Sequence, residues 1–379
     1  MAGHIRKRTD SKGKVTYQVV LDKGINPDGK RLRSYSTHNT LKEARAILAE
    51  QEDSINKGTY IEPSKMTVQE LCEEWFRVHA PKIAENTQRG YRVNLDKHIY
   101  PLIGGTKVQQ LTASMLTECY EKILKSGLNA RSVQFCHTTL HAALKYGMKA
   151  RYLNHNVAEL TSPPKQEKYK PYIYTDEEIK RLLAAAEGSV HEIPVKLAIG
   201  LGLRRGEVLG LMWSDVDFRK NTIEVRHNLL CVNGEKSIGD PKTEAGKRTL
   251  VVPEELMKLL RKHKTQQAEK RLALGDRWED NDLVCCTGNG TPYHAGSYSV
   301  MFHRFLERKG LPHCRFHDLR HINATLMLKS GVNMKVCQTR LGHSDISTTM
   351  DIYSHVDTEM QSQAANNLNN ILFGQAVNE

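Results

Sequence analysis

The sequence predicts an α+β protein of several domains: a small N-terminal three-stranded β-sheet with one helix, a helical middle domain, and a mainly α-helical C-terminal domain with a small β-sheet. The chain has 379 residues, a length typical of two or three domains. Short β-type runs fill the N-terminal segment, helical periodicity dominates the rest, and a proline-rich stretch separates two helical regions. We expect domains at 1–60, 64–160 and 172–379, with a linker at 161–171.

The charge balance favours a polyanionic partner. Lys and Arg number 55 against 43 Asp and Glu, a net charge of +12. The eight cysteines form no C-x-x-C pair, which is typical of a reduced, cytoplasmic protein. The N-terminus has no apolar stretch after its charges, and no run reaches the roughly 18–20 apolar residues of a membrane span. The composition therefore argues against a secreted or membrane-spanning protein.

Alternating strands and turns predict the N-terminal domain. β-type runs at His4–Arg8, Val15–Leu21 and Leu32–Tyr35 are separated by Ser-Lys-Gly and Asn-Pro-Asp-Gly segments, whose residues favour turns. A helix should then begin at Thr40, because Glu43 three residues later completes a capping box.

The basic residues of this domain are candidates for DNA binding. Residues 1–38 hold nine Lys or Arg against three Asp, which is half of the net charge of the chain. Strands of this kind enter DNA major grooves. We expect DNA contacts from Arg6, Lys7, Arg8, Lys14, Arg31 and Arg33. The alternative is a basic hairpin that is merely solvated.

Helix signals follow from residue 64 onward. Thr67 and Glu70 form a capping box that opens the amphipathic run Val68–Val78. Further helices are expected at 87–99, 114–125 and 130–150, with breaks at Pro101, Gly104-Gly105 and Gly127. Arg89 and Arg92 are further candidates for phosphate contacts, although charges on a helix surface often serve solvation alone.

The third domain is predicted to begin with the helix that Thr175 and Glu178 cap. β-type runs at 221–227 and 236–253 interrupt its helices. The first polar residue in an unexpected place is Arg204, in Gly-Leu-Arg-Arg-Gly-Glu between two apolar helices. Such a position is costly unless the arginine meets an anion or a carboxylate, and Glu207 and Asp215 are the expected partners. The alternative is a purely structural Arg–Glu pair.

Lys242 lies in Asp-Pro-Lys-Thr between β-type runs, near the tip of an expected hairpin. A lysine there can swing into a site as a mobile proton donor, although surface hairpins often carry lysines without a function. His317 and Arg320 of His-Asp-Leu-Arg fall on one face of the helix that they open, and can therefore address the same group.

A zinc site is the competing interpretation of this histidine segment. His313, His317 and His321 recur every four residues, and Cys314 is adjacent. We expect neither a metal nor a cofactor, because His313 follows a proline ahead of the helix and the sequence near it offers no second cluster of ligands.

Two more motifs follow: His343 in Leu-Gly-His, and Tyr353 in Met-Asp-Ile-Tyr. A lone tyrosine of this kind is most often a half-buried core residue. The whole ordered set, however, resembles the tyrosine recombinases, the integrases of phages and conjugative transposons. The six residues are spaced by 38, 75, 3, 23 and 10 positions. The family pattern favours Arg204 over Arg205 as the first arginine.

The resemblance spans the chain and gives each part an expected role. It implies an arm-type DNA-binding sheet, a SAM-like core-binding domain and a catalytic domain. It also implies strand cleavage through a 3′-phosphotyrosine on Tyr353, with Lys242 as the acid for the 5′-hydroxyl. Arg204 and Arg320 can each direct two N–H donors at phosphate oxygens. His317 is expected as general base and His343 as hydrogen-bond donor, with their division left open.

The predicted function is therefore site-specific DNA recombination that integrates, and also excises, a mobile element or prophage. The alternatives are a type IB topoisomerase-like strand transferase and a non-catalytic DNA-binding regulator. Expected partners are attachment-site DNA, three further copies in a tetramer, an excisionase and a DNA-bending host factor, in the cytoplasm and nucleoid of a bacterial host. The tail 357–379 has an apolar stripe that docks onto a neighbouring protomer or its own domain: Met360, Ala364, Leu368, Ile371 and Leu372.

Overall fold

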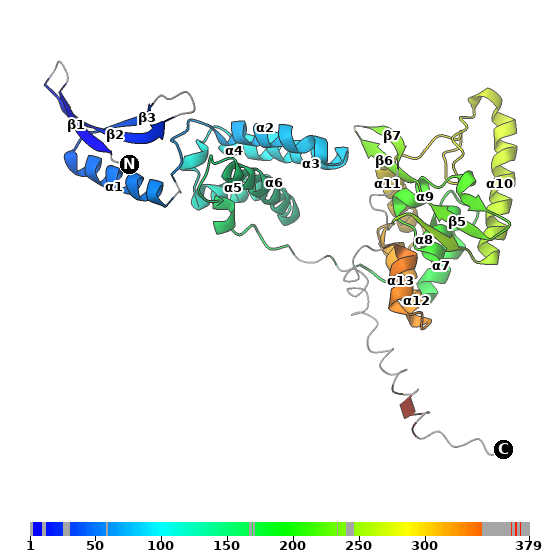
Figure 1. Ribbon diagram of the computed structural model, residues 1–379. Coiled ribbons are helices and arrows are strands. Elements are labelled where there is room, and N and C mark those ends of the chain that lie inside the picture. Colours follow the sequence, from blue (N-terminus) through cyan, green and yellow to red (C-terminus); the bar gives the residue numbers. More distant parts are fainter. Residues whose placement is uncertain are drawn as a thin grey trace. The chain divides into compact units, whose positions relative to one another are not determined.

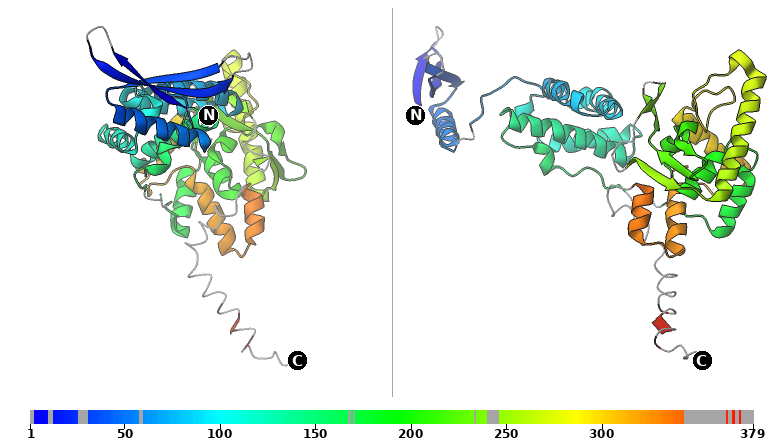
Figure 2. Two further views of the ribbon diagram at one scale, coloured as in Figure 1. Left: turned by 60° about the vertical axis from the view of Figure 1, so that its left-hand side comes forward. Right: turned by 45° about the vertical axis from the view of Figure 1, so that its right-hand side comes forward.

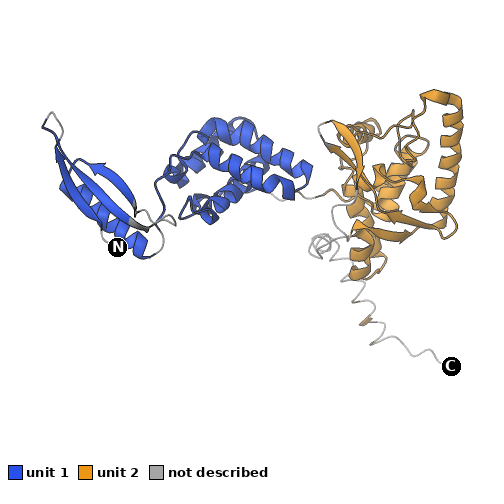
Figure 3. Cartoon of the chain, turned by 45° about the horizontal axis from the view of Figure 1, so that its top comes forward, with its two compact units in different colours: residues 1–168 blue, residues 169–379 orange. Residues whose placement is uncertain are grey.

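The computed structural model describes residues 3–9, 13–25, 31–57, 60–166, 169, 171–232, 234–239, 246–342, 365, 368, 369 and 372. Contacts divide the chain into two units, residues 1–168 and 169–379 (Figure 3). The fold combines helices with small antiparallel sheets, as the sequence predicts (Figure 1).

The first part of unit 1 is a three-stranded antiparallel sheet in the order β1-β2-β3, made of β1 (His4–Thr9), β2 (Val15–Ile25) and β3 (Arg31–His38). Helix α1 (Leu41–Asn56) packs along one face of this sheet (Figure 2). The Thr40 hydroxyl accepts a hydrogen bond from the Glu43 N–H at 3.2 Å. The predicted strands and the start of the helix are confirmed.

The second part of unit 1 is helical: α2 (Val68–His79), η1 (Ala80–Lys82), α3 (Glu85–Val93), η2 (Asn94–Ile99), α4 (Tyr100–Ile103), η3 (Val108–Gln110), α5 (Ala113–Lys125), α6 (Ala130–Lys149) and η4 (Val157–Leu160). The capping box of Thr67 and Glu70 is present, as predicted. Apolar stripes of the helices, including Leu71, Trp75 and Leu140, meet in one core.

The expected break at Pro101 is wrong. Residues 94–99 form a π-helical segment, and the helical path continues through Pro101 to Ile103. A π segment shifts the backbone pairing by one residue, so that the Tyr100 N–H donates to the Leu95 carbonyl. Pro101 lies in the first turn of α4. Its missing N–H is tolerated there, because an N–H in the first turn of a helix has no partner within the helix.

Unit 2 is built on helices: α7 (Asp176–Ala186), α8 (Glu192–Leu201), α9 (Arg205–Leu209), η5 (Trp213–Asp215), α10 (Glu254–Leu274), η7 (Gly275–Arg277), α11 (Ala295–Arg308), α12 (Asp318–Lys329) and α13 (Met334–Leu341). Thr175 and Glu178 form the predicted capping box at α7. Helix α8 is buried around most of its surface, including Val195, Leu197 and Ala198. Helix α12 packs against both α8 and α13 (Figure 1).

Two small sheets complete unit 2. One has the order β4-β5-β8, with β4 (Val216–Asp217), β5 (Thr222–Val225) and β8 (Arg248–Val251); the other pairs β6 (Asn228–Val232) with β7 (Glu235–Gly239). The hairpin expected around Lys242 falls on residues 240–245, outside the described residues; the strands before and after it, β7 and β8, lie in different sheets. A turn at Gly234, with φ +86°, returns β7 onto β6 instead.

A search of the described residues for a helix long and apolar enough to cross a bilayer finds none.

Candidate active site

Arg204 lies between α8 and α9, where the backbone changes direction. Gly202 ends α8 in the left-handed conformation at φ +66°, and Arg204 is the N-cap residue of α9. Its guanidinium donates to Glu207 Oε1 at 2.7 Å and to the Gly342 carbonyl at 2.8 Å, while its backbone N–H donates to Glu207 Oε2 at 3.0 Å. The side chain keeps 36% of its surface exposed, so that the held guanidinium can still meet a ligand.

Glu207 is the buried carboxylate that holds this arginine. It also accepts hydrogen bonds from Arg248, at 3.0 Å to Oε2 and 3.4 Å to Oε1. Burial raises the pKa of Glu207, but the charges and hydrogen bonds of Arg248 and Arg204 outweigh burial and leave that pKa lowered. Glu207 is therefore an ionised clamp for two arginines.

The predicted role of Asp215 as a second partner of Arg204 is wrong. Asp215 is buried, and its carboxylate accepts hydrogen bonds from Arg226 at 2.5 Å and from the His227 ring at 2.8 Å. The η5 turn between α9 and β4 places Asp215 beside the segment that follows β5.

Arg320 is only 2% exposed and lies in the first turn of α12. Its guanidinium donates to the Gly202 carbonyl at 2.6 Å and to the Leu341 carbonyl. These carbonyls belong to the C-terminal ends of α8 and α13, where helices leave carbonyl groups unpaired and carry partial negative charge. Burial, with the like charges of Arg204 and Arg248, lowers the pKa of Arg320 to about 9.

Arg204 and Arg320 thus donate to the carbonyls of two consecutive residues: Arg204 to that of Gly342, and Arg320 to that of Leu341. Arg204 and Arg248 donate to the Glu207 carboxylate, and Arg320 is close enough to interact with it through charge. Like charges gathered in a partly buried place are unfavourable until an anion joins them, and planar guanidiniums suit phosphate oxygens. We define these three arginines and Glu207 as the arginine cluster. Its chemistry fits the binding of a phosphate group.

His317 is the N-cap residue of α12, one turn before Arg320. The residue is exposed to solvent, but the atoms packed around its ring, with the neighbouring His321, Arg320 and Arg204, lower its pKa to about 4. The ring is therefore neutral near pH 7 and able to accept a proton. That His317 and Arg320 fall on one helical face and address the same group stays a prediction: His317 is the exposed N-cap residue, whereas Arg320 is buried in the first turn of α12.

Three candidate residues, Lys242, His343 and Tyr353, lie outside the described residues. His343 directly follows Gly342, whose carbonyl accepts from Arg204. Of the tail stripe, Met360, Ala364 and Ile371 also lie outside, while Leu368 and Leu372 are described as exposed.

The alternative of a zinc site has no support among the residues that the structure describes. No three His, Cys, Asp or Glu side chains gather there as a metal site. The His313 ring packs against His303 at 4.6 Å between centroids, whereas His317 packs against His321 at 5.6 Å.

The register of the N-terminal sheet sorts its basic residues between two faces. Arg6 pairs with Gln18, Arg8 with Thr16 and Arg33 with Asp22, and these positions share the face opposite α1. We call this the open sheet face; it also carries Tyr35, which is 57% exposed. Lys7 pairs with Tyr17 and belongs to the face toward α1.

The remaining DNA-binding candidates differ in their surroundings. Lys14 and Arg89 are exposed, and the Arg31 backbone starts β3. Arg92 instead donates to both oxygens of Glu73 at 2.9 Å and to Asp96 at 2.7 Å. Its guanidinium is therefore already engaged by two carboxylates within its own domain.

Sequence reasoning missed Arg248. Its side chain, 7% exposed, donates to Glu207, to the Gly246 carbonyl at 2.9 Å and to the Arg340 carbonyl at 2.7 Å. The only signal in the sequence was that Arg248 lies beside β-type residues. Its partners Glu207 and Arg340 are 41 and 92 positions away, so no local pattern indicates them.

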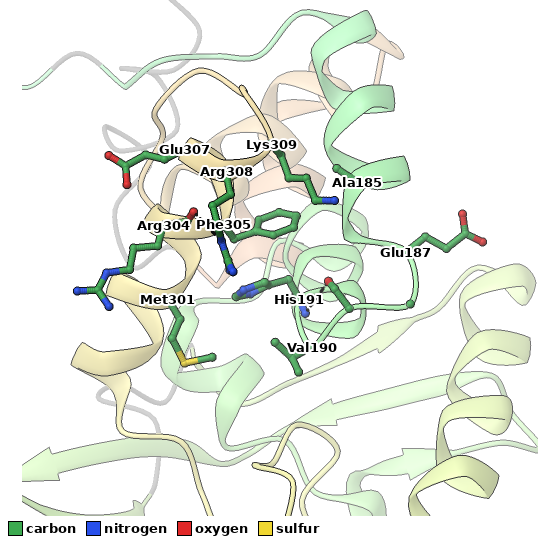
Figure 4. A pocket seen from close by; sticks show the side chains of 12 residues that line it. Ala185, Glu187, Val190, His191, Met301, Arg304, Phe305, Glu307, Arg308 and Lys309 are labelled. Atoms are coloured by element: carbon green, nitrogen blue, oxygen red, sulfur yellow. Dashed lines mark hydrogen bonds between the residues drawn. The ribbon is translucent and has the colours of Figure 1, made fainter.

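A cavity of about 890 Å³ lies elsewhere in unit 2, between α11 and the segment after α7 (Figure 4). Val190, His191, Phe305 and Arg308 are among its lining residues. Because none of the candidate catalytic residues lines this cavity, we do not assign it to the chemistry.

The chain is similar in sequence to known proteins. Residues 173–360 match the phage integrase family, and residues 67–124 match the N-terminal SAM-like domain of phage integrases. A tyrosine recombinase XerC-like protein of Caldanaerobacter subterraneus is 28% identical, covering 95% of this chain and 97% of its own. The ICEBs1 integrase of Bacillus subtilis is 24% identical, covering 94% and 97%.

Solved structures agree on the fold. The integrase of transposon Tn1549, bound to transposon right-end DNA, superposes with a TM-score of 0.69 at 22% identity, covering 80% of this chain and 99% of the other. A lambda integrase dimer on a core site gives 0.57 at 20% identity, covering 76% and 95%. These matches define a DNA strand-transferase. The chain belongs to the phage integrase family, the tyrosine recombinases.

Proposed function

We propose that this recombinase integrates and excises a mobile element or prophage by cleaving and rejoining DNA at attachment sites. The single observation that carries the proposal is the arginine cluster. Arg204 and Arg320 are held at neighbouring carbonyls, with an excess of positive charge that a scissile phosphate would neutralise.

The proposed reaction is a transfer of one phosphoryl group. The Tyr353 oxygen attacks the phosphorus, and the bond from phosphorus to the 5′-oxygen breaks. His317, neutral near pH 7, accepts the tyrosine proton, and Lys242 supplies a proton to the leaving 5′-oxygen. A 3′-phosphotyrosine ester results, and attack by a 5′-hydroxyl reverses the step. The ester keeps the energy of the broken bond, so that rejoining needs no nucleotide cofactor.

Arg204 and Arg320 would stabilise the negative charge that grows on the non-bridging oxygens, and His343 would add a hydrogen bond. The carbonyls of Gly202, Leu341 and Gly342 hold the two guanidiniums in place before DNA arrives. Such preorganisation spares the transition state the cost of arranging these donors.

We further propose roles for the domains at 1–60, 64–160 and 172–379: arm-site binding, core-site binding and catalysis. The open sheet face supports the first role, because Arg6, Arg8 and Arg33 share it. The proposed assembly is a homotetramer on two DNA sites, assisted by an excisionase and a DNA-bending host factor, on the nucleoid of a bacterial host.

A nicked attachment-site duplex tests the chemistry. The wild-type chain should form a denaturant-stable protein–DNA adduct, whereas Tyr353→Phe should form none. An unchanged adduct in the variant would refute the nucleophile. Full cleavage should persist in EDTA, and its loss on chelation would favour metal chemistry.

A deletion separates recombination from topoisomerase-like relaxation. Removing residues 1–60 should abolish integration and leave cleavage of isolated core sites intact. Normal integration by the truncated chain would refute the arm-binding role.

A further inference from the structure

A tyrosine of the linker is fastened to the turn that carries His317. Tyr169 is the first residue of unit 2, and its hydroxyl donates to Asp318 Oδ2 at 2.8 Å. The Arg315 guanidinium lies 3.5 Å from the centroid of the Tyr169 ring. Tyr169 therefore holds both residues that flank the segment 316–317.

Asp318 is the buried centre of this arrangement. Its carboxylate also accepts the Arg315 backbone N–H at 2.8 Å and the Arg315 guanidinium at 2.9 Å. Burial raises the pKa of Asp318, but the hydrogen bonds from Arg315 and Tyr169 outweigh burial and leave that pKa lowered. An ionised, buried carboxylate thus closes the turn 315–318 from inside.

This turn determines where His317 lies. His317 lies in this turn between Arg315 and Asp318, and its carbonyl accepts the Arg320 N–H at 3.2 Å. The Asp318 N–H donates to the Arg315 carbonyl at 2.8 Å. A change in the Asp318 carboxylate would therefore alter the turn that holds the His317 backbone, and through it the place of the ring and the first turn of α12.

We propose that Tyr169 is a positioning residue for catalysis, which fixes His317 through Asp318 and Arg315. Tyr169 itself has no contact with the arginine cluster among the described contacts, so that it acts through Asp318. Because Tyr169 belongs to the linker, its hydrogen bond to Asp318 connects the linker to the turn that positions His317, the proposed general base. This inference rests on the proposed role of His317.

The chain offers a matched control. Tyr172 lies three residues further along, is 43% exposed against 48% for Tyr169, and donates to a carboxylate, Glu178, at the same 2.8 Å. Glu178 caps α7 and has no part in the turn of His317. Tyr169→Phe and Tyr172→Phe each remove one hydroxyl, but only the first touches Asp318.

The experiment measures single-turnover cleavage of the nicked duplex by the full chain. Tyr169→Phe should lower the rate at saturating protein about tenfold, the effect expected when a buried carboxylate loses one donor, with DNA affinity unchanged within about twofold. Tyr172→Phe should leave both quantities within about twofold of wild type. Equal effects of the two variants, or a loss confined to DNA affinity, would overturn the proposal.

A second readout does not depend on activity. In the full chain labelled with ¹³C-histidine, Tyr169→Phe should move the ring resonance of His317, assigned through His317→Gln, while Tyr172→Phe should not. An unmoved resonance in Tyr169→Phe would refute the positioning role even if wild type proved inactive. Absence of any wild-type adduct would instead refute the proposed function alone.

Discussion

Arginine is used in opposite ways at the two ends of this chain. On the open sheet face Arg6, Arg8 and Arg33 are exposed on strands. In the arginine cluster Arg320 is 2% exposed, and its guanidinium donates to the carbonyls of Gly202 and Leu341. Exposed side chains adapt to a phosphate backbone at low cost, whereas buried ones are aligned in advance.

The difference shows what each region can supply. Exposed charges add to affinity roughly one by one and are screened by salt. A partly buried guanidinium pair is costly to assemble but is aligned in advance, as a site needs where charge develops in a reaction. Under the proposed function, the same residue type would serve binding by number and catalysis by placement.

The sharpest way to break the comparison is Arg320→Lys. A lysine lacks the planar fork that joins the carbonyls of Gly202 and Leu341, so cleavage should fall about 10²- to 10³-fold while arm-site binding persists. Single-turnover cleavage and gel-shift titration measure the two quantities. Arg340→Lys, which loses a hydrogen bond to the Val251 carbonyl in the same unit, is the control and should stay within about threefold. Parallel loss of cleavage and binding would contradict the division.

Acid should weaken unit 2 through its buried histidine. Burial lowers the pKa of His191 to about 4, so the unfolded chain binds this proton first and stability is lost as pH falls from about 6.5 to about 4. The expected loss is about 3 kcal/mol for this group. Urea titrations followed by tryptophan fluorescence should show it.

His191→Phe should flatten that pH slope, whatever its effect at pH 7. Tyr298→Phe, which removes the hydroxyl 3.1 Å from His191 Nδ1 but keeps the histidine, should retain the slope. An unchanged slope in His191→Phe would assign the acid loss to other groups.

Gly202→Ala tests how strictly the cluster depends on its backbone. A Cβ at Gly202 would lie 2.4 Å from Leu341 Cδ2 and 2.6 Å from Asn323 Oδ1, at φ +66°. We expect a loss of about 2–3 kcal/mol, with reduced cleavage because the Gly202 carbonyl holds Arg320. Gly188→Ala, at φ +68° but with open space around it, should cost only about 1 kcal/mol. Equal losses would show that backbone strain, rather than close packing, sets the effect.

The smallest expected effect compares neighbours on one strand. Arg6→Ala should weaken arm-site binding a few-fold and reduce the salt slope by about one, whereas Lys7→Ala, on the face toward α1, should change the slope by less than half as much. Affinity measured at several salt concentrations decides between them. Equal slopes would mean that the sheet does not bind DNA by its open face.

Local signals predicted the elements well, because caps and periodicity act over a few residues. The capping boxes at Thr67 and Thr175 are examples. Predictions failed where a turn redirected the chain or the backbone shifted register. The π segment carried a helix past Pro101, and Asp215 was placed with Arg226 rather than with Arg204.

The sequence alone determined the fold class, the family and the candidate residues Arg204, His317 and Arg320, since short motifs in a set order carry that information. Only the tertiary structure decided which groups hold the side chains of these residues in place. The Glu207 clamp with Arg248, the carbonyls of Leu341 and Gly342, and the bond from Tyr169 to Asp318 each join residues between 21 and 149 positions apart. Such contacts follow from packing α12 against α8 and α13, and no local pattern encodes them.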